Sequence, residues 1–119
     1  MEANVLKKVA AALVALDAGA LVALYSDDFA FEDRSSGESI TDKLKLREYF
    51  DRLFALPGVK FSNVHFFNCG EQGAGEWTWS GQSRESGQTY RITGASIFTL
   101  SAGAVEREAV FYDPGPANA

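Results

Sequence analysis

The sequence predicts an α+β fold in which helices come first and an antiparallel sheet follows. In the first half of the chain, apolar residues recur at three- and four-residue spacing, which is typical of amphipathic helices. From residue 59 the period changes to the two-residue alternation that is typical of strands. A bent sheet with helices across its concave face leaves a cone-shaped interior. We therefore expect a cone-shaped α+β barrel, with three N-terminal helices packed on a strongly curved, mainly antiparallel sheet.

Two helices are expected before residue 26. The apolar face of residues 3–16 is formed by Val5, Leu6, Val9, Leu13 and Leu16. Asp17-Ala18-Gly19 ends this helix, and residues 20–25 predict a second, short one. The pair Lys7-Lys8 before an apolar run also resembles a secretory signal peptide, but its cleavage would remove a helix that the domain needs.

The stretch 25–33 ends in the carboxylate to which we assign chemistry. Residues 29–33 alternate with period two and predict a strand, with Phe29, Phe31 and Asp33 on one face. A carboxylate on the same face as two phenylalanines is buried or half-buried, and burial raises the pKa of a carboxyl group toward the range useful to a general base. Asp33 is therefore the candidate base. The alternative is that Asp33 caps the following loop or pairs with Arg34.

A third helix and four strands complete the expected fold. Residues 34–38 form a polar loop, Thr41 or Asp42 caps the next helix, and residues 43–55 carry a long apolar face. Pro57-Gly58 stops that helix. The expected strands are 59–69, 76–82, 89–100 and 104–112, with a Gly-rich turn at 70–75. One domain then spans residues 1–113, and residues 114–119 form a loose tail.

Composition and charge exclude several classes of partner. The chain has 119 residues and a net charge of −5, and its basic residues form no stripe along which nucleic acid would lie. With one histidine and one cysteine, zinc-ligand spacing is absent, so no metal site is expected. No apolar run has membrane-spanning length. The single Cys69 cannot form an internal disulfide, which suits the cytoplasm.

Short segments throughout the chain match a known order of elements: a helix, a short helix, a strand that ends in an acid, a helix and a meander of strands. They are Leu16–Gly19, Leu24–Asp33, Leu46–Phe50, Gly94–Leu100, Gly103 and Val110–Asp113. This arrangement resembles the nuclear transport factor 2-like superfamily, in particular its SnoaL-like branch, and the resemblance covers nearly the whole chain. The superfamily hosts isomerases, polyketide cyclases, dehydratases, epoxide hydrolases and non-catalytic members, so the fold does not decide the activity.

When residue roles are carried over position by position, the resemblance implies a general base but not the hydrogen-bond donors that act with it. In ketosteroid isomerase a general-base aspartate closes this strand, which implies that role for Asp33. The two donors to the enolate oxygen correspond to Ala12, which cannot donate, and Ser96, which donates weakly. Limonene-epoxide-hydrolase-like members carry an acid where this chain has Val110. SnoaL-type cyclases use an acid and a histidine, which implies His65 here.

The other candidates each have a structural alternative. His65 either transfers a proton or is a hydrogen-bonded core residue. Tyr112 is the best remaining donor, and Glu108 is either a second functional acid or lies near the open rim. The residues expected to line an apolar pocket, or else to fill the core, are Phe29, Phe31, Phe50, Phe67, Trp77, Trp79, Ser96, Phe98 and Val110.

We therefore expect a pocket for a small hydrophobic molecule, with acid/base catalysis of the isomerase, cyclase or dehydratase type. Asp33 would be the base, and His65, Tyr112 or Ser96 would polarise an oxygen. This chemistry needs neither a metal nor an organic cofactor. The alternative is a non-catalytic ligand-binding or protein-association module of the same fold. The outer sheet face at Ala95, Ile97 and Thr99 is moderately apolar, which predicts a homodimer through the sheet.

Overall fold

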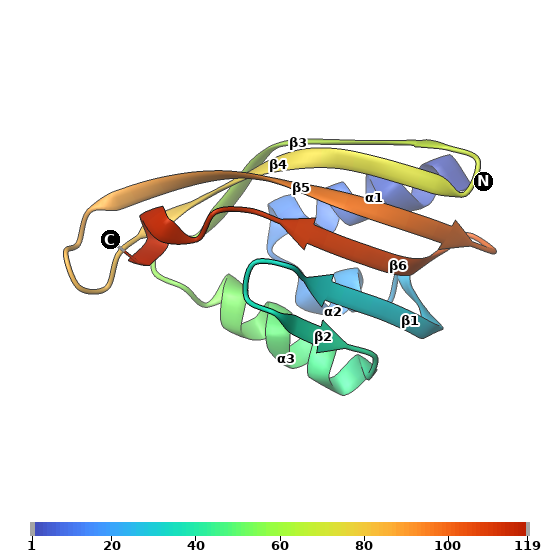
Figure 1. Cartoon of the computed structure of the whole chain (residues 1–119), viewed down its shortest axis with the longest axis horizontal. Coiled ribbons are helices and arrows are strands. Elements are labelled where there is room, and N and C mark those ends of the chain that lie inside the picture. The colour runs from blue at the N-terminus through green and yellow to red at the C-terminus, as the bar shows by residue number, and fades with distance from the viewer. Residues whose placement is uncertain (1, 119) are drawn as a thin grey trace.

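A computed structural model describes residues 2–118, with side chains from residue 5 to residue 117. The elements in chain order are α1 (Glu2–Ala15), α2 (Ala18–Val22), β1 (Tyr25–Asp33), β2 (Glu38–Ile40), α3 (Lys43–Phe54), β3 (Lys60–Cys69), β4 (Gln72–Gln82), β5 (Thr89–Ser101), β6 (Ala104–Phe111) and a 3-10 turn (Gly115–Asn118). The predicted α+β class is confirmed. The helices lie on one side of a curved sheet that does not close on itself (Figure 1).

The six strands form one sheet in the order β2-β1-β6-β5-β4-β3. Every neighbouring pair is antiparallel except β1 and β6, which run parallel. In that parallel pair Phe31 lies opposite Glu108 and Asp33 lies opposite Val110. The last strand of the chain therefore brings its side chains beside those of the first, at the centre of the sheet (Figure 1).

Strand β2 was not predicted, and β1 begins at Tyr25 and not at residue 29. Residues 34–37 make a tight turn in which Gly37 has a φ of 82° and donates to the Asp33 carbonyl at 2.8 Å, so residues 38–40 fold back onto β1. A three-residue strand is too short to show alternation in the sequence. Strand β1 begins at Tyr25, but a register shift between Tyr25 and Ala30 interrupts its alternation. For this reason the sequence pattern does not reveal the first residues of the strand.

Strand β4 also begins earlier than expected. Residues 70–75 were predicted to be a turn, but the turn ends before Gln72 and two of its glycines lie inside the strand. At Gly75 a Cβ atom would lie 2.1 Å from the His65 carbonyl oxygen, so only glycine fits this approach to β3. The glycines that suggested a turn are thus explained by close strand packing.

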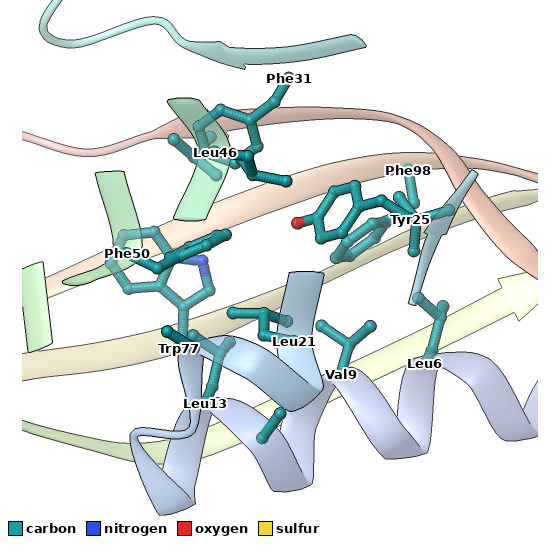
Figure 2. Packing of buried hydrophobic residues seen from close by; sticks show 14 of the residues in the cluster. Leu6, Val9, Leu13, Leu21, Tyr25, Phe31, Leu46, Phe50, Trp77 and Phe98 are labelled. Carbon is teal, nitrogen blue, oxygen red and sulfur yellow. The ribbon is translucent and has the colours of Figure 1, made fainter. Parts of the chain in front are cut away.

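The core lies between the helices and the concave face of the sheet. Figure 2 shows Leu6, Val9 and Leu13 of α1 pointing toward the aromatic rings of Tyr25, Phe50 and Trp77. Helix α3 buries Leu46 and Phe50, the centre of its predicted apolar face. Ala117, in the 3-10 turn after β6, also packs against this core. Within residues 2–118, no helix is both long enough and apolar enough to cross a membrane.

Candidate functional site

A small aromatic cavity lies between helices α1 and α3 and the concave face of the sheet. Its walls come from Val9, Leu13, Leu21, Tyr25, Phe31, Tyr49, Phe50, Leu53, Phe61, Trp77, Trp79, Ser96, Glu108, Val110 and Tyr112. Its volume is about 40 Å³, room for about three water molecules. A pocket that encloses a drug-sized ligand measures roughly 300–1,000 Å³. In this closed form the cavity holds only a few non-hydrogen atoms.

Among the described residues that line the cavity, Glu108 alone carries a carboxyl group. Strand β6 carries its side chain inward, and the residue is only 6% exposed. The Tyr25 hydroxyl donates a hydrogen bond to Glu108 Oε1, and Ser96 also hydrogen-bonds the carboxyl group. The Trp77 Nε1–H donates to Ser96 Oγ at 3.0 Å, so the serine proton is free to point at Glu108. The ion pairs formed by the described residues do not include Glu108.

These surroundings place Glu108 between two protonation states near neutral pH. Burial raises the pKa of the Glu108 carboxyl to about 7, although the hydrogen bonds from Tyr25 and Ser96 act in the opposite direction. Burial, reinforced by the neighbouring Glu108, holds the pKa of the Tyr25 hydroxyl well above its usual range. Tyr25 is therefore a neutral donor, and the proton that moves at this site belongs to Glu108.

Asp33 lies at the end of β1 with all its acceptor positions engaged. Its Oδ1 accepts the backbone N–H groups of Ser35 and Ser36, both at 3.0 Å. Its Oδ2 accepts the hydroxyls of Tyr49 and Tyr112, both at 2.7 Å. Arg34 pairs with Glu32 on the other face of the strand. Asp33 thus caps the turn and at the same time binds two tyrosines, one from α3 and one that follows β6.

The two tyrosines stand between Asp33 and the cavity. Tyr49 and Tyr112 line the cavity, whereas Asp33 does not. Burial, together with the hydrogen bond to Asp33, raises the pKa of each tyrosine hydroxyl above its usual range, so both remain neutral donors. A molecule in the closed cavity meets the tyrosine hydroxyls first and reaches Asp33 only through them.

The structure brings most of the predicted pocket residues together. Seven line the cavity, namely Phe31, Phe50, Trp77, Trp79, Ser96, Val110 and Tyr112. Phe29 and Phe98 are buried in the core outside the cavity wall. His65 and Phe67 are exposed on β3, and Phe67 keeps 68% of its surface accessible. His65 therefore stands apart from the cavity in this arrangement.

Sequence reasoning missed Tyr25 and Tyr49 and left the position of Glu108 open. The sequence did offer a signal for Tyr49, because it belongs to the predicted apolar face of α3 and a buried tyrosine hydroxyl needs a hydrogen-bond partner. Alternation with Val110 places Glu108 on the inward face, and the structure buries both residues. The register shift between Thr99 and Leu100 accounts for Val105, which is also buried although strict alternation would place it on the outer face.

The described residues offer no group of three or more His, Cys, Asp or Glu side chains arranged to bind a metal ion. The polar atoms that face the cavity are instead the carboxyl group of Glu108 and the hydroxyls around it. Such a set can donate, accept and transfer protons without an added group.

An open, curved six-stranded sheet that wraps around helices and an apolar interior defines the nuclear transport factor 2-like class of α+β proteins. Residues 6–116 match the family model of the SnoaL-like domain, and the chain belongs to that family. The chain matches none of the curated proteins with which it was compared.

Solved structures share this fold at low sequence identity. A nuclear transport factor 2-like protein from Burkholderia thailandensis has a TM-score of 0.84 and 18% identity, with 97% of this chain and 92% of that chain covered. A candidate polyketide cyclase from Pseudomonas putida has a TM-score of 0.82 and 22% identity, covering 98% and 94%. A protein with a ketosteroid isomerase-like fold from Catenulispora acidiphila, in complex with trimethylamine, has a TM-score of 0.83 and 16% identity, covering 95% and 88%. At these identities the likeness concerns the fold.

Proposed function

We propose that the cavity binds a small, largely apolar molecule and that the protein moves a proton on it without a cofactor, as isomerases, cyclases and dehydratases do. The observation that carries this proposal is Glu108. Its carboxyl group lies in the wall of an aromatic cavity, its hydrogen-bond partners are neutral, and burial raises its pKa to about 7. A general acid or base works best when its pKa lies near the working pH.

The proposed step is a proton transfer within a bound carbonyl compound. The ionised Glu108 takes a proton from a carbon next to the carbonyl group, the electron pair of the broken C–H bond forms a C=C bond, and the π pair of the C=O bond moves to the oxygen, which becomes the enolate oxygen. Once the carboxyl proton has exchanged with solvent, a proton returns from Glu108 to a carbon atom and restores both groups. Tyr25 and Ser96 hold the carboxyl group in place during the transfer.

Asp33 enters this proposal through the tyrosines. An enolate oxygen beside Tyr112 or Tyr49 would meet a hydroxyl donor, the type of partner that stabilises such a charge. When the tyrosine turns its proton to the ligand, the Asp33 carboxylate loses one of its four donors. The role of Asp33 as direct base, which the resemblance implies, requires a tyrosine to move aside.

A specific observation favours a second candidate, a non-catalytic binding module of the same fold. The Glu108 carboxyl and the hydroxyls of the cavity wall already have hydrogen-bond partners within the protein, and Ala12, at the position of a donor in the isomerase, is buried and apolar. A ligand would then be held mainly by apolar contact. Binding without proton transfer is the signature of this candidate.

Hydrogen–deuterium exchange separates the two candidates. Cyclopentanone in deuterated buffer is the probe, and proton NMR follows loss of the hydrogens beside its carbonyl group. We expect the protein to accelerate this exchange, Glu108→Gln to abolish the acceleration, and Glu106→Gln on the same strand to leave it unchanged. Equal acceleration by Glu108→Gln and the parent protein would refute the role of Glu108. Binding with no acceleration would establish the second candidate.

A further inference from the structure

We infer that the ligand site is larger than the closed cavity: it continues into an outer hollow beyond Tyr49 and Tyr112, and it takes an elongated apolar ring compound with a polar, oxygen-bearing end. This inference rests on the proposed function, because it assumes that the cavity is a ligand site. It assigns Asp33 a positioning role, since Asp33 holds the side chains that separate the two compartments.

The outer hollow lies directly behind the cavity wall. It measures about 530 Å³ and is lined by Asp33, Ser36, Glu38, Tyr49, Arg52, Leu53, Ala55, Leu56, Arg84 and Tyr112. Three of these residues, Tyr49, Leu53 and Tyr112, also line the cavity. The partition between the compartments therefore consists of three side chains.

The partition is the most exposed part of the cavity wall. Tyr49, Leu53 and Tyr112 are each partly exposed, whereas Phe31 and Phe50 beside them are only 1% and 4% exposed. The backbone of Tyr112 is held, because its N–H donates to Ser35 Oγ at 2.9 Å. Opening therefore requires rotation of tyrosine side chains and leaves the sheet unchanged.

A single oxygen atom, Asp33 Oδ2, accepts the hydrogen bonds of both tyrosine hydroxyls. The hydroxyls of Tyr49 and Tyr112 meet at Asp33 Oδ2, although one residue belongs to α3 and the other follows β6. A ligand that offers an oxygen atom to either hydroxyl can replace Asp33 as its acceptor. Such an exchange keeps the tyrosine hydrogen-bonded while its ring moves out of the partition.

Size and polarity together define the ligand class. The closed cavity of about 40 Å³ is too small for an elongated ring compound, whereas the cavity and hollow together fall within the range of drug-sized pockets. The inner end is aromatic, so it suits an apolar ring. In the outer compartment Arg52 pairs with Glu38 at 3.2 Å, while Arg84 takes part in none of the ion pairs of the described residues. An oxygen-bearing end of the ligand fits beside Arg84.

The test compares a short and a long probe through the indole N–H signals of Trp77 and Trp79, both of which line the cavity. The short probe is cyclopentanone, and the long probe is 8-anilinonaphthalene-1-sulfonate. We expect both probes to shift the Trp77 signal in the parent protein. Ala55→Phe, which narrows the hollow and leaves the cavity wall unchanged, should weaken the long probe by about tenfold or more and spare the short one. The matched control is Ala11→Phe, another exposed alanine, which should change neither.

A second variant tests the partition without filling space. Tyr112→Phe removes one hydroxyl from Asp33 and should speed association of the long probe, with little change for the short one. The inference is overturned if the long probe fails to shift Trp77 while the short probe does, or if Ala55→Phe binds both as the parent does. If the long probe alone shifts Trp77, the larger site stands, and the proposal that the cavity by itself binds a molecule as small as cyclopentanone is wrong. If neither probe shifts Trp77, both proposals are wrong.

Discussion

Asp33 and Glu108 lie on the paired central strands β1 and β6, and both side chains are almost fully buried. Asp33 accepts four hydrogen bonds, two of them from backbone N–H groups. Glu108 is held by hydroxyl groups in an apolar wall. The comparison teaches that burial alone does not assign chemistry to a carboxylate. A fully engaged carboxylate organises its surroundings, whereas a sparsely engaged one exchanges protons.

The largest expected effect is the loss of Asp33. Asp33→Ala leaves two tyrosine hydroxyls and two backbone N–H groups without their acceptor, so we expect unfolding free energy to fall by about 4 kcal/mol. Urea unfolding measures this loss. Glu32→Ala on the opposite face removes only a surface ion pair and should cost less than about 1 kcal/mol. Equal losses in the two variants would contradict the organising role of Asp33.

The second prediction concerns the pH dependence of stability. Because the pKa of Glu108 is raised from 4.5 to about 7, the folded protein binds more protons than the unfolded chain between these values. Its stability contribution is therefore full below pH 4.5 and is lost as pH rises through 7, a change on the order of 3 kcal/mol. Glu108→Gln should remove this component from stability measured across that pH range. A pH profile identical to that of the parent protein would show that folding does not raise the pKa of Glu108.

A smaller effect should distinguish the donors of the two carboxylates. The hydrogen bond from Tyr25 lowers the pKa of Glu108, so Tyr25→Phe should raise the pH midpoint of that residue by about one unit. Tyr112→Phe removes a donor from Asp33 and should leave the midpoint of Glu108 unchanged. Carboxyl NMR titration measures both. A shift of the same size in each variant would mean that the two carboxylates titrate as one coupled system.

The smallest expected effect on stability lies on the outer face of the same sheet. Ser96 and Phe98 of β5 point inward, while Ile97 between them is 53% exposed and lies in one cross-strand row with Ala74 and Ala109. We propose that this face forms a homodimer. Ile97→Glu should convert the dimer to a monomer in sedimentation experiments and change unfolding free energy of the protomer by no more than about 0.5 kcal/mol. A parent protein that sediments as a monomer would refute the proposal.

The sequence was sufficient for those parts of the fold that local patterns determine. The apolar spacing of α3 predicted its position within a residue or two, and alternation placed Phe29, Phe31 and Asp33 on one buried face. Strand β2 and the early start of β4 depend on tight turns and on glycines packed between strands, which the same composition also permits in a loop. Local pattern does not distinguish these cases.

The site was predictable only in part, because its contacts connect distant segments. Asp33 stood out through its neighbours in sequence, but its partners Tyr49 and Tyr112 lie 16 and 79 residues away. Alternation places Glu108 on the inward face, but whether it lies in the cavity wall or near the open rim depends on side chains from distant elements that close the cavity. The resemblance to a superfamily directed attention to Asp33, although the carboxyl group in the cavity wall belongs to Glu108.

The parallel pairing of β1 with β6 has a consequence for how the protein is made. Strand β1 leaves the ribosome before α3 and strands β3 to β5, and β6 follows all of them. Until β6 emerges, the β1–β2 hairpin has no sheet to join, and both the cavity wall and the partner of Tyr25 are missing. Such long-range pairing slows folding, because the chain loses the entropy of closing a long loop before the contacts between β1 and β6 form. Assembly of the sheet centre and assembly of the site are therefore the same late event.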